Sequence, residues 1–144
     1  IMGEIVRMSG ASQFAHTMST LLTAGMPVLQ AIEVSGRTMT NLCMSGEVLQ
    51  TLPGVEGGRP LGECMSYARE LPPMLVQMTS VGEATGSMES TLQVLAEYYD
   101  SEVDVRVKRA LSLLEPAIIV VLAIFVVFIL MAVYLPMFSM YSAI

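Results

Sequence analysis

The residue types that perform most enzyme chemistry are few in this sequence of 144 residues. His16 is the only histidine, and no second histidine or cysteine stands three or four residues away, where one helix face would bring the two together. Cys43 and Cys64 lack the CxxC spacing of a metal or redox site and are too few for a disulfide framework. We therefore expect no catalytic residue among them, and we interpret His16 as a partly exposed helix residue.

Two other patterns lack the residues that would make them binding sites. Residues 54–59 are glycine-rich, yet the Lys-Ser/Thr of a P-loop does not follow them, and Glu56 would repel a phosphate. Glu83, Glu89 and Glu97 could share a metal ion on spacing alone, but carboxylates dispersed along helices are usually solvated. No HExxH or serine-histidine-acid motif occurs. We expect no metal, no cofactor and no enzymatic activity.

The composition narrows the class of protein. Hydrophobic residues make up 53% of the chain, which is too many for a disordered protein. The 13 acidic residues outnumber the 7 basic ones, and this balance argues against a nucleic-acid partner, because phosphate binding needs clustered lysine and arginine. The length allows one soluble domain. Since the chain begins with Ile1, we expect it to be part of a longer protein.

An uncharged run near the C-terminus predicts a transmembrane helix. Residues 117–135 contain no charged side chain, and 19 residues at 1.5 Å each are about as long as the hydrocarbon core is thick. The alternative is a helix buried in a soluble core, but the preceding 115 residues could hardly cover every face of it. We predict a transmembrane helix at 116–138, with lipid around it and a short tail at 139–144.

The flanks of this run predict its orientation. Arg106, Lys108 and Arg109 precede it, and no basic residue follows it. The positive-inside rule then places residues 1–115 in the cytoplasm and the tail on the other side of the membrane. Tyr134 and Tyr141 suit the far headgroup layer, where aromatic rings with a polar edge are favoured.

Helical periodicity predicts an all-α fold for the remainder. Gly25 ends a first helix that starts at Ser12, and Pro27 can open the next, because a first turn needs no backbone donor. Pro53-Gly54 should break the third helix. Residues 1–11 are expected to be a linker from a preceding membrane segment. The six expected helices span about 12–24, 27–37, 40–52, 60–69, 74–83 and 88–115.

The Gly-x-Pro-apolar pattern occurs twice, at 25–28 and 58–61, which is a separation of 33 residues. Such a period can indicate a solenoid. We favour two helix hairpins, in which glycine stops one helix and proline starts the next, because two copies are too few for a repeat array and no third copy follows.

The last expected helix has no breaker between 88 and 115 and is expected to continue into the membrane with a kink at Pro116. Glu102–Arg106 and Asp104–Lys108 have the favourable i,i+4 order on it. Such continuity would transmit a rotation or tilt of the soluble part to the membrane. Its apolar stripe is Leu92, Leu95, Ala96, Tyr99, Val103, Val107, Ala110 and Leu114.

Three stretches, at 14–32, at 81–88 and around Leu114-Glu115-Pro116 with Leu135-Pro136, carry a family likeness. Together the chain resembles the F domain of the inner-membrane platform proteins of bacterial type II secretion systems and type IV pilus machines. The resemblance implies an antiparallel six-helix cytoplasmic bundle at 12–115, followed by the last transmembrane helix. Family members have two such domains, so the chain is expected to be the C-terminal half.

The resemblance also implies a function without catalysis. A platform subunit couples a cytoplasmic ATPase to the assembly of pilins or pseudopilins. The implied partners are that ATPase, other inner-membrane assembly proteins, pilins and further copies in a homo-oligomer, all at the bacterial inner membrane. The rival interpretations are a tail-anchored signalling or adaptor domain and a membrane enzyme, and the missing catalytic constellation argues against the latter.

The positions that match the family motif are few, and no partner-binding residue is predicted. Gly82 and Gly86 would permit a close helix approach and a helix stop, while Glu83 would pair with a cation, cap the next helix or simply stabilise the turn. Glu115 would stay wet at the membrane boundary, an intramembrane role being the alternative. Pro53-Gly54 and Gly62 depart from the family pattern. The motif positions are Gly25, Pro27, Gly82, Glu83, Gly86, Glu115, Pro116 and Pro136.

Overall fold

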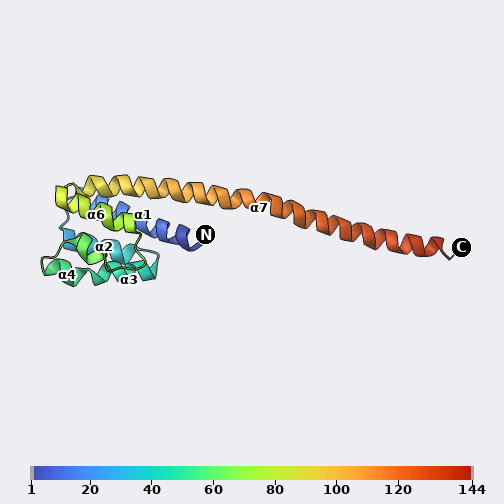
Figure 1. Cartoon of the computed structure of the whole chain (residues 1–144), viewed down its shortest axis with the longest axis horizontal. Helices are drawn as coiled ribbons and strands as arrows, with labels where there is room; N and C mark the ends of the chain where they lie inside the picture. Colours follow the sequence, from blue (N-terminus) through green and yellow to red (C-terminus); the bar gives the residue numbers. More distant parts are fainter. Residues whose placement is uncertain (1, 144) are drawn as a thin grey trace. The chain divides into compact units, whose positions relative to one another are not determined.

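The computed structural model describes residues 2–143, and within this range the chain is helical and contains no strand. The predicted all-α fold with one long C-terminal helix is confirmed (Figure 1). The chain divides into two compact units, residues 1–105 and 106–144. The helices are α1 (Met2–Thr23), α2 (Val28–Thr38), α3 (Leu42–Gln50), α4 (Leu52–Glu56), α5 (Leu61–Met65), α6 (Pro73–Thr85) and α7 (Met88–Tyr141).

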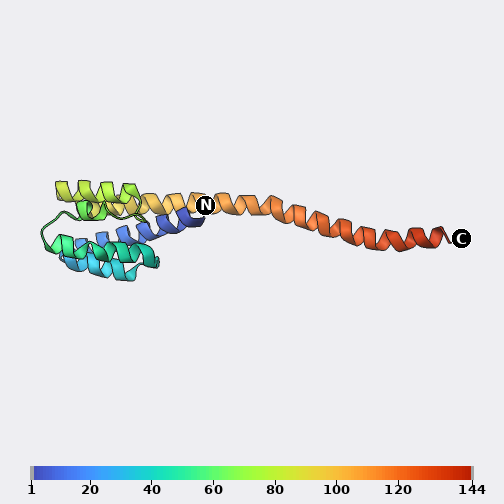
Figure 2. The same ribbon diagram turned by 60° about the horizontal axis from the view of Figure 1, so that its bottom comes forward.

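The first unit is a helical bundle around one apolar core. In Figures 1 and 2, α1 lies between the first turns of α7 and the α2–α3 pair. The Ser19 hydroxyl donates to the Glu89 carbonyl at 2.9 Å, and Ser12 bonds to Asp100, so α1 and the start of α7 are antiparallel. The largest fully buried side chains include Phe14, Met18, Ile32, Met44, Leu61, Met65, Leu75, Leu92 and Leu95.

Glycines at the ends of helices and prolines before the next helices form the turns. Gly25 and Gly58 have φ of +85° and +88°, a left-handed conformation that suits glycine at a helix end. Each is followed two residues later by a proline, Pro27 or Pro60, whose φ of −58° directly precedes the next helix. The interpretation of the repeated motif as two helix hairpins is therefore confirmed.

Three features differ from the prediction by more than two residues: the start of α1, the additional helix α4, and the end of α5 at Met65, where we expected a helix up to residue 69. Helix α1 begins at Met2 and not at Ser12, so the expected linker is helical over residues 2–11. The third helix ends at Gln50, and a separate short helix, α4, follows it, with Pro53 in its first turn. Proline has no backbone N–H, but the first turn of a helix does not use that donor. Pro53 therefore lies at the start of α4 and does not interrupt a helix.

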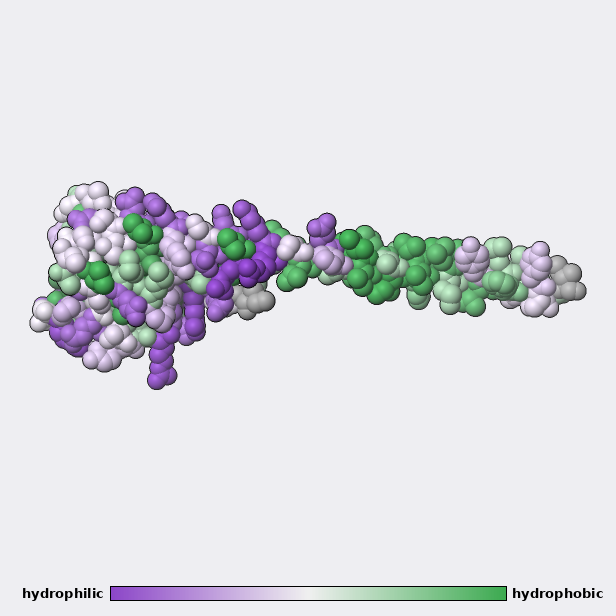
Figure 3. Space-filling view, turned by 45° about the horizontal axis from the view of Figure 1, so that its top comes forward, coloured by the Kyte–Doolittle hydropathy of each residue, from purple (hydrophilic) through white to green (hydrophobic). Residues whose placement is uncertain are grey.

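Helix α7 is long and apolar enough to cross a membrane, and the part that could cross is exposed along its length. Its green surface in Figure 3 contrasts with the mostly purple and white bundle. Pro116 and Pro136 both lie inside the helix. The predicted stripe is buried from Leu92 to Tyr99, whereas Val107 and Leu114 are exposed.

Candidate functional site

Helix α5 has only five residues, and a carboxylate from another helix holds its N-terminus. The two oxygens of Glu83, in the last turn of α6, accept from the backbone amides of Leu61 at 2.9 Å and Gly62 at 3.1 Å. Pro60, which precedes α5, makes no side-chain cap. A carboxylate near the C-terminus of α6 opposes the dipole of that helix, and the bonds to α5 offset this cost. Glu83 therefore caps a helix, but an earlier one and not the next one.

A second carboxylate holds the chain after α5 in the same way. The oxygens of Glu47, on α3, accept from the amides of Arg69 and Glu70, both at 2.9 Å. We call Glu47, Glu83 and the four amides that they bind the α5 clamp. The clamp ties α5 and the loop after it to α3 and α6.

The motif glycines next to the clamp allow close packing. A Cβ atom on Gly82 would lie 2.9 Å from the Cα of Met88, so only glycine fits where α6 turns into α7. Gly86 adopts φ of +67° and ends α6, while the amide of Ser87 donates to the Gly82 carbonyl at 2.9 Å. Gly62 also faces α6, because a Cβ there would lie 2.8 Å from the Cα of Ser80. This packing gives a physical reason for glycine at position 62.

The structure brings some motif residues together and not others. Gly82, Glu83 and Gly86 form one turn beside α5. Gly25 and Pro27 form the separate turn between α1 and α2. Glu115, Pro116 and Pro136 belong to the second unit and lie on α7. The eight motif residues thus lie in three separate places. Those of the first unit start, stop or cap helices, whereas Glu115, Pro116 and Pro136 lie inside α7.

His16, for which the sequence offers no partner, has one in the structure. Its Nε2 lies 2.9 Å from Oδ2 of Asp100, and the Ser12 hydroxyl donates to the other oxygen of Asp100. We call these three residues the Asp100 cluster. The Ser12 bond first, and then His16, lowers the pKa of Asp100, against the opposing effect of partial burial.

The order of groups in the Asp100 cluster determines its chemistry. The carboxylate stands between the hydroxyl and the imidazole, so Ser12 donates to Asp100 and not to His16. A serine nucleophile needs a base within hydrogen-bond reach of its own hydroxyl, with a third group orienting that base. The cluster instead joins α1 to α7. Sequence reasoning missed it because 84 residues separate His16 from Asp100.

Tyr99 is a second polar group at the core. Its side chain is 2% exposed, and its hydroxyl lies near the Leu75 backbone without a well-formed hydrogen bond among residues 2–143. Burial raises the pKa of Tyr99 to about 12. Within the same described range, no group of three or more histidine, cysteine, aspartate or glutamate side chains could hold a metal ion.

Comparison with known proteins identifies the family. The family model described as type II secretion system (T2SS), protein F matches residues 14–136. The chain is 37% identical to the type IV pilus assembly protein PilC of Pseudomonas aeruginosa over 141 residues, 97% of this chain and 37% of that protein. It is 31% identical to PilC of Myxococcus xanthus over its whole length, 34% of that protein.

The chain has a similar level of sequence identity to a protein of a secretion system. The type II secretion system protein F of Vibrio cholerae is 31% identical over 140 residues, 97% of this chain and 34% of that protein. The chain thus spans about a third of the length of the curated relatives that it matches. Because the family model covers most of the helical bundle and the apolar part of α7, the chain belongs to the type II secretion system protein F family.

Proposed function

We propose that the chain is part of an inner-membrane platform subunit that couples a cytoplasmic ATPase to the assembly of pilins or pseudopilins. The observation that carries this proposal is the family match at 14–136, which includes both the bundle and the apolar segment. Its relatives are named for pilus assembly and for type II secretion. The proposal assigns the chain a mechanical role and no catalytic step.

The mechanical role is supported by the course of α7. The helix starts in the bundle at Met88 and ends at Tyr141, beyond the apolar run. No glycine lies between residues 88 and 144. We propose that movement of the bundle, imposed by the ATPase, reaches the membrane through this helix. The other partners of the whole protein are further inner-membrane assembly proteins, pilins and additional copies in a homo-oligomer.

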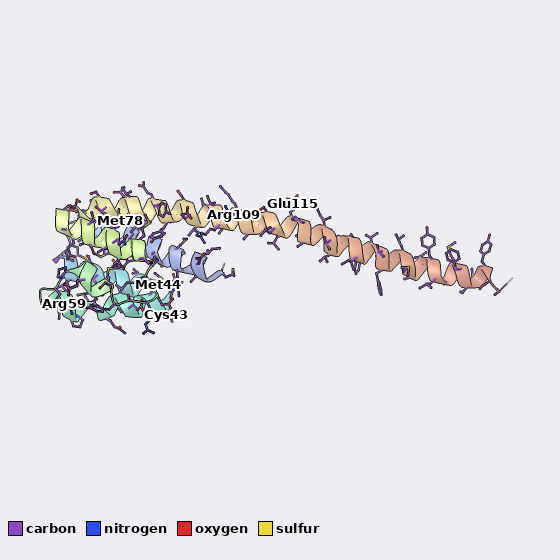
Figure 4. The ribbon with its side chains drawn as sticks, viewed as in Figure 1. Cys43, Met44, Arg59, Met78, Arg109 and Glu115 are labelled. Atoms are coloured by element: carbon purple, nitrogen blue, oxygen red, sulfur yellow. The ribbon has the colours of Figure 1, made fainter. Side chains whose placement is uncertain are left out.

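We further propose that residues 1–115 lie in the cytoplasm, that 116–138 span the bacterial inner membrane and that 139–144 lie outside the cytoplasm. Cysteine labelling tests this orientation, because Cys43 is exposed on the bundle (Figure 4). In a C64S variant, a membrane-impermeant maleimide should label Cys43 only after the cells are permeabilised. In a C43S/C64S/S142C variant, intact spheroplasts should be labelled. The opposite pattern would contradict the orientation.

The partner assignment needs the full-length protein. Affinity purification from solubilised membranes should recover a hexameric assembly ATPase, and deletion of residues 12–115 should abolish its recovery. A matched control that deletes only 139–144 should retain the ATPase. Recovery of a signalling complex in place of the ATPase would favour the tail-anchored adaptor.

A further inference from the structure

Three of the seven basic residues of the chain lie within four positions of α7, at Arg106, Lys108 and Arg109. Lys108 and Arg109 are exposed, and Figure 4 labels Arg109 on the helix ahead of the apolar run. At 1.5 Å per residue, Arg109 precedes residue 117 by about 12 Å along the axis. The polar headgroup layer is about 5–8 Å thick on each side of the hydrocarbon core. The charge therefore stands within about one Debye length of lipid phosphates.

The residues between the basic group and the apolar run bring the two closer. Leu111, Leu113 and Leu114 are 58%, 64% and 52% exposed. These side chains extend the apolar surface of α7 toward Arg109, so that only Ala110 separates that surface from the basic residues. Burial of these leucines at the acyl boundary would draw the cations down to the headgroups, since the free energy gained grows with buried apolar area.

The acidic residues of α7 do not neutralise this group on its membrane side. Glu97, Asp100, Glu102 and Asp104 all precede the basic residues in the sequence. Glu115 is the single acid between Arg109 and the end of the chain. It follows Lys108 by seven residues, which is about two helical turns or about 10 Å, too far for an ion pair. Apart from Glu115, the charged residues of α7 therefore change from acidic to basic toward the apolar run.

We propose that Arg106, Lys108 and Arg109 form a binding site for the phosphate groups of acidic phospholipids. Arginine can bind a phosphate with two parallel hydrogen bonds, and lysine adds a compact charge. The site would give the helix a preferred depth and a preference for anionic lipid over zwitterionic lipid. The proposal rests on the proposed insertion of 116–138 into a bilayer.

Spin-labelled lipids test the site directly. The 144-residue chain is reconstituted in phosphatidylcholine bilayers that contain a trace of spin-labelled phosphatidylglycerol or spin-labelled phosphatidylcholine. The motionally restricted fraction in the electron paramagnetic resonance spectrum measures association of each lipid with the helix. One cation near a charged surface changes association about fivefold. We expect the association of phosphatidylglycerol with the helix to be at least about fivefold stronger than that of phosphatidylcholine. Salt at 1 M should reduce this preference.

Two variants of equal charge separate a local site from net charge. R106Q/K108Q/R109Q should reduce the preference to about one, whereas R37Q/R59Q/R69Q, which removes three exposed cations from the bundle, should retain it. Equal association of the two lipids with the unaltered chain would overturn the lipid site alone. The same holds if both variants reduce the preference equally. If neither lipid shows a restricted fraction, insertion fails and the proposed function fails with the site.

Discussion

Glu83 takes the place of an N-cap for α5, although it lies twenty-two residues further along the chain. The amides that it binds belong to Leu61 and Gly62, both of which are buried. A buried donor that loses its acceptor costs the full desolvation of that group. At the scale of single residues, these carboxylates therefore act by accepting hydrogen bonds from backbone amides. Glu47 does the same for the amides of Arg69 and Glu70 in the loop after α5.

Replacement of Glu83 tests how much its hydrogen bonds to the amides of Leu61 and Gly62 contribute to stability. We expect E83A to lower the free energy of unfolding by about 2 kcal/mol, because two buried amides lose their acceptor. E83Q should lose less, because its amide oxygen can still accept one bond. Urea unfolding in detergent, followed by circular dichroism, measures both. E56A, at an exposed glutamate that ends α4, is the control, and an equal loss there would refute the assignment.

Tyr99 predicts a loss of stability at high pH. Burial raises its pKa to about 12, while the unfolded residue titrates near 10. Between these values the unfolded chain has lost the proton and the folded chain keeps it, so stability falls as pH rises from about 10 to 12. Y99F should remove this part of the fall and should be at least as stable at pH 7, because it also removes a buried hydroxyl without a well-formed bond.

The control for Tyr99 is an exposed tyrosine. Y67F alters a side chain that is 74% exposed and should leave the alkaline slope unchanged. Thermal unfolding of the three proteins between pH 7 and 11.5 provides the comparison. The prediction for Tyr99 would be wrong if Y99F and Y67F lost stability in parallel.

At the scale of elements, the glycines decide how closely helices approach. Gly62 faces Ser80, and Gly82 faces Met88, and in each case a methyl group added to the glycine would lie within 3 Å of backbone atoms. We expect G62A and G82A each to lower the free energy of unfolding by about 1–3 kcal/mol, the usual cost of overpacking. Gly46 has open space around it and lies inside α3. G46A should therefore stabilise the protein by about 0.5–1 kcal/mol.

These three alanine variants differ only in the space around one methyl group. In the same detergent, the free energy of unfolding should be highest for G46A, lower for the unaltered chain, and lowest for G62A and G82A. A stabilising effect of G62A or G82A would show that α6 can move away from its neighbours at no cost.

Sequence could predict the parts of the fold that depend on adjacent residues. Gly25, Pro27 and Gly86 determine backbone conformation by themselves, so the stops and starts of helices could be predicted. The α5 clamp and the Asp100 cluster could not, because each joins residues more than twenty positions apart and no local pattern marks them. Only the packed structure brings their atoms together.

Two boundary errors have the same kind of cause. Gly3 and Gly10 lower helix propensity, which makes residues 1–11 look like a linker. In the structure, Gly10 packs against Met44, so the glycine provides room for α3 and does not end α1. Pro53 looks like a breaker because the end of α3 at Gln50, one turn before it, has no sequence signal of its own.

At the scale of the whole molecule, the proposed function requires that α7 transmit movement. An insertion of Gly-Gly-Ser after Leu111 in the full-length protein should abolish piliation or secretion, because it removes helical continuity between bundle and span. The amount of this variant in the membrane and the stability of its bundle should remain as in the unaltered protein. Pili counted on cells, or secreted protein measured in the medium, provide the result.

A helical insertion of seven residues at the same place is the control. Seven residues add about two turns and return the helix to within about 20° of its original phase. This variant should retain activity if continuity is what matters. Normal function with Gly-Gly-Ser would refute mechanical coupling through α7 and would leave the bundle with a docking role only.

The α5 clamp also has a consequence for the order in which the chain is made. Translation produces α5 well before Glu83, so its first amides have no partner until α6 has left the ribosome. Helices of five residues are unstable alone. The nascent chain should therefore carry an unformed segment at 61–70 until synthesis passes residue 83. Proteases that act on translation intermediates should cut there first and should lose access once α6 has docked.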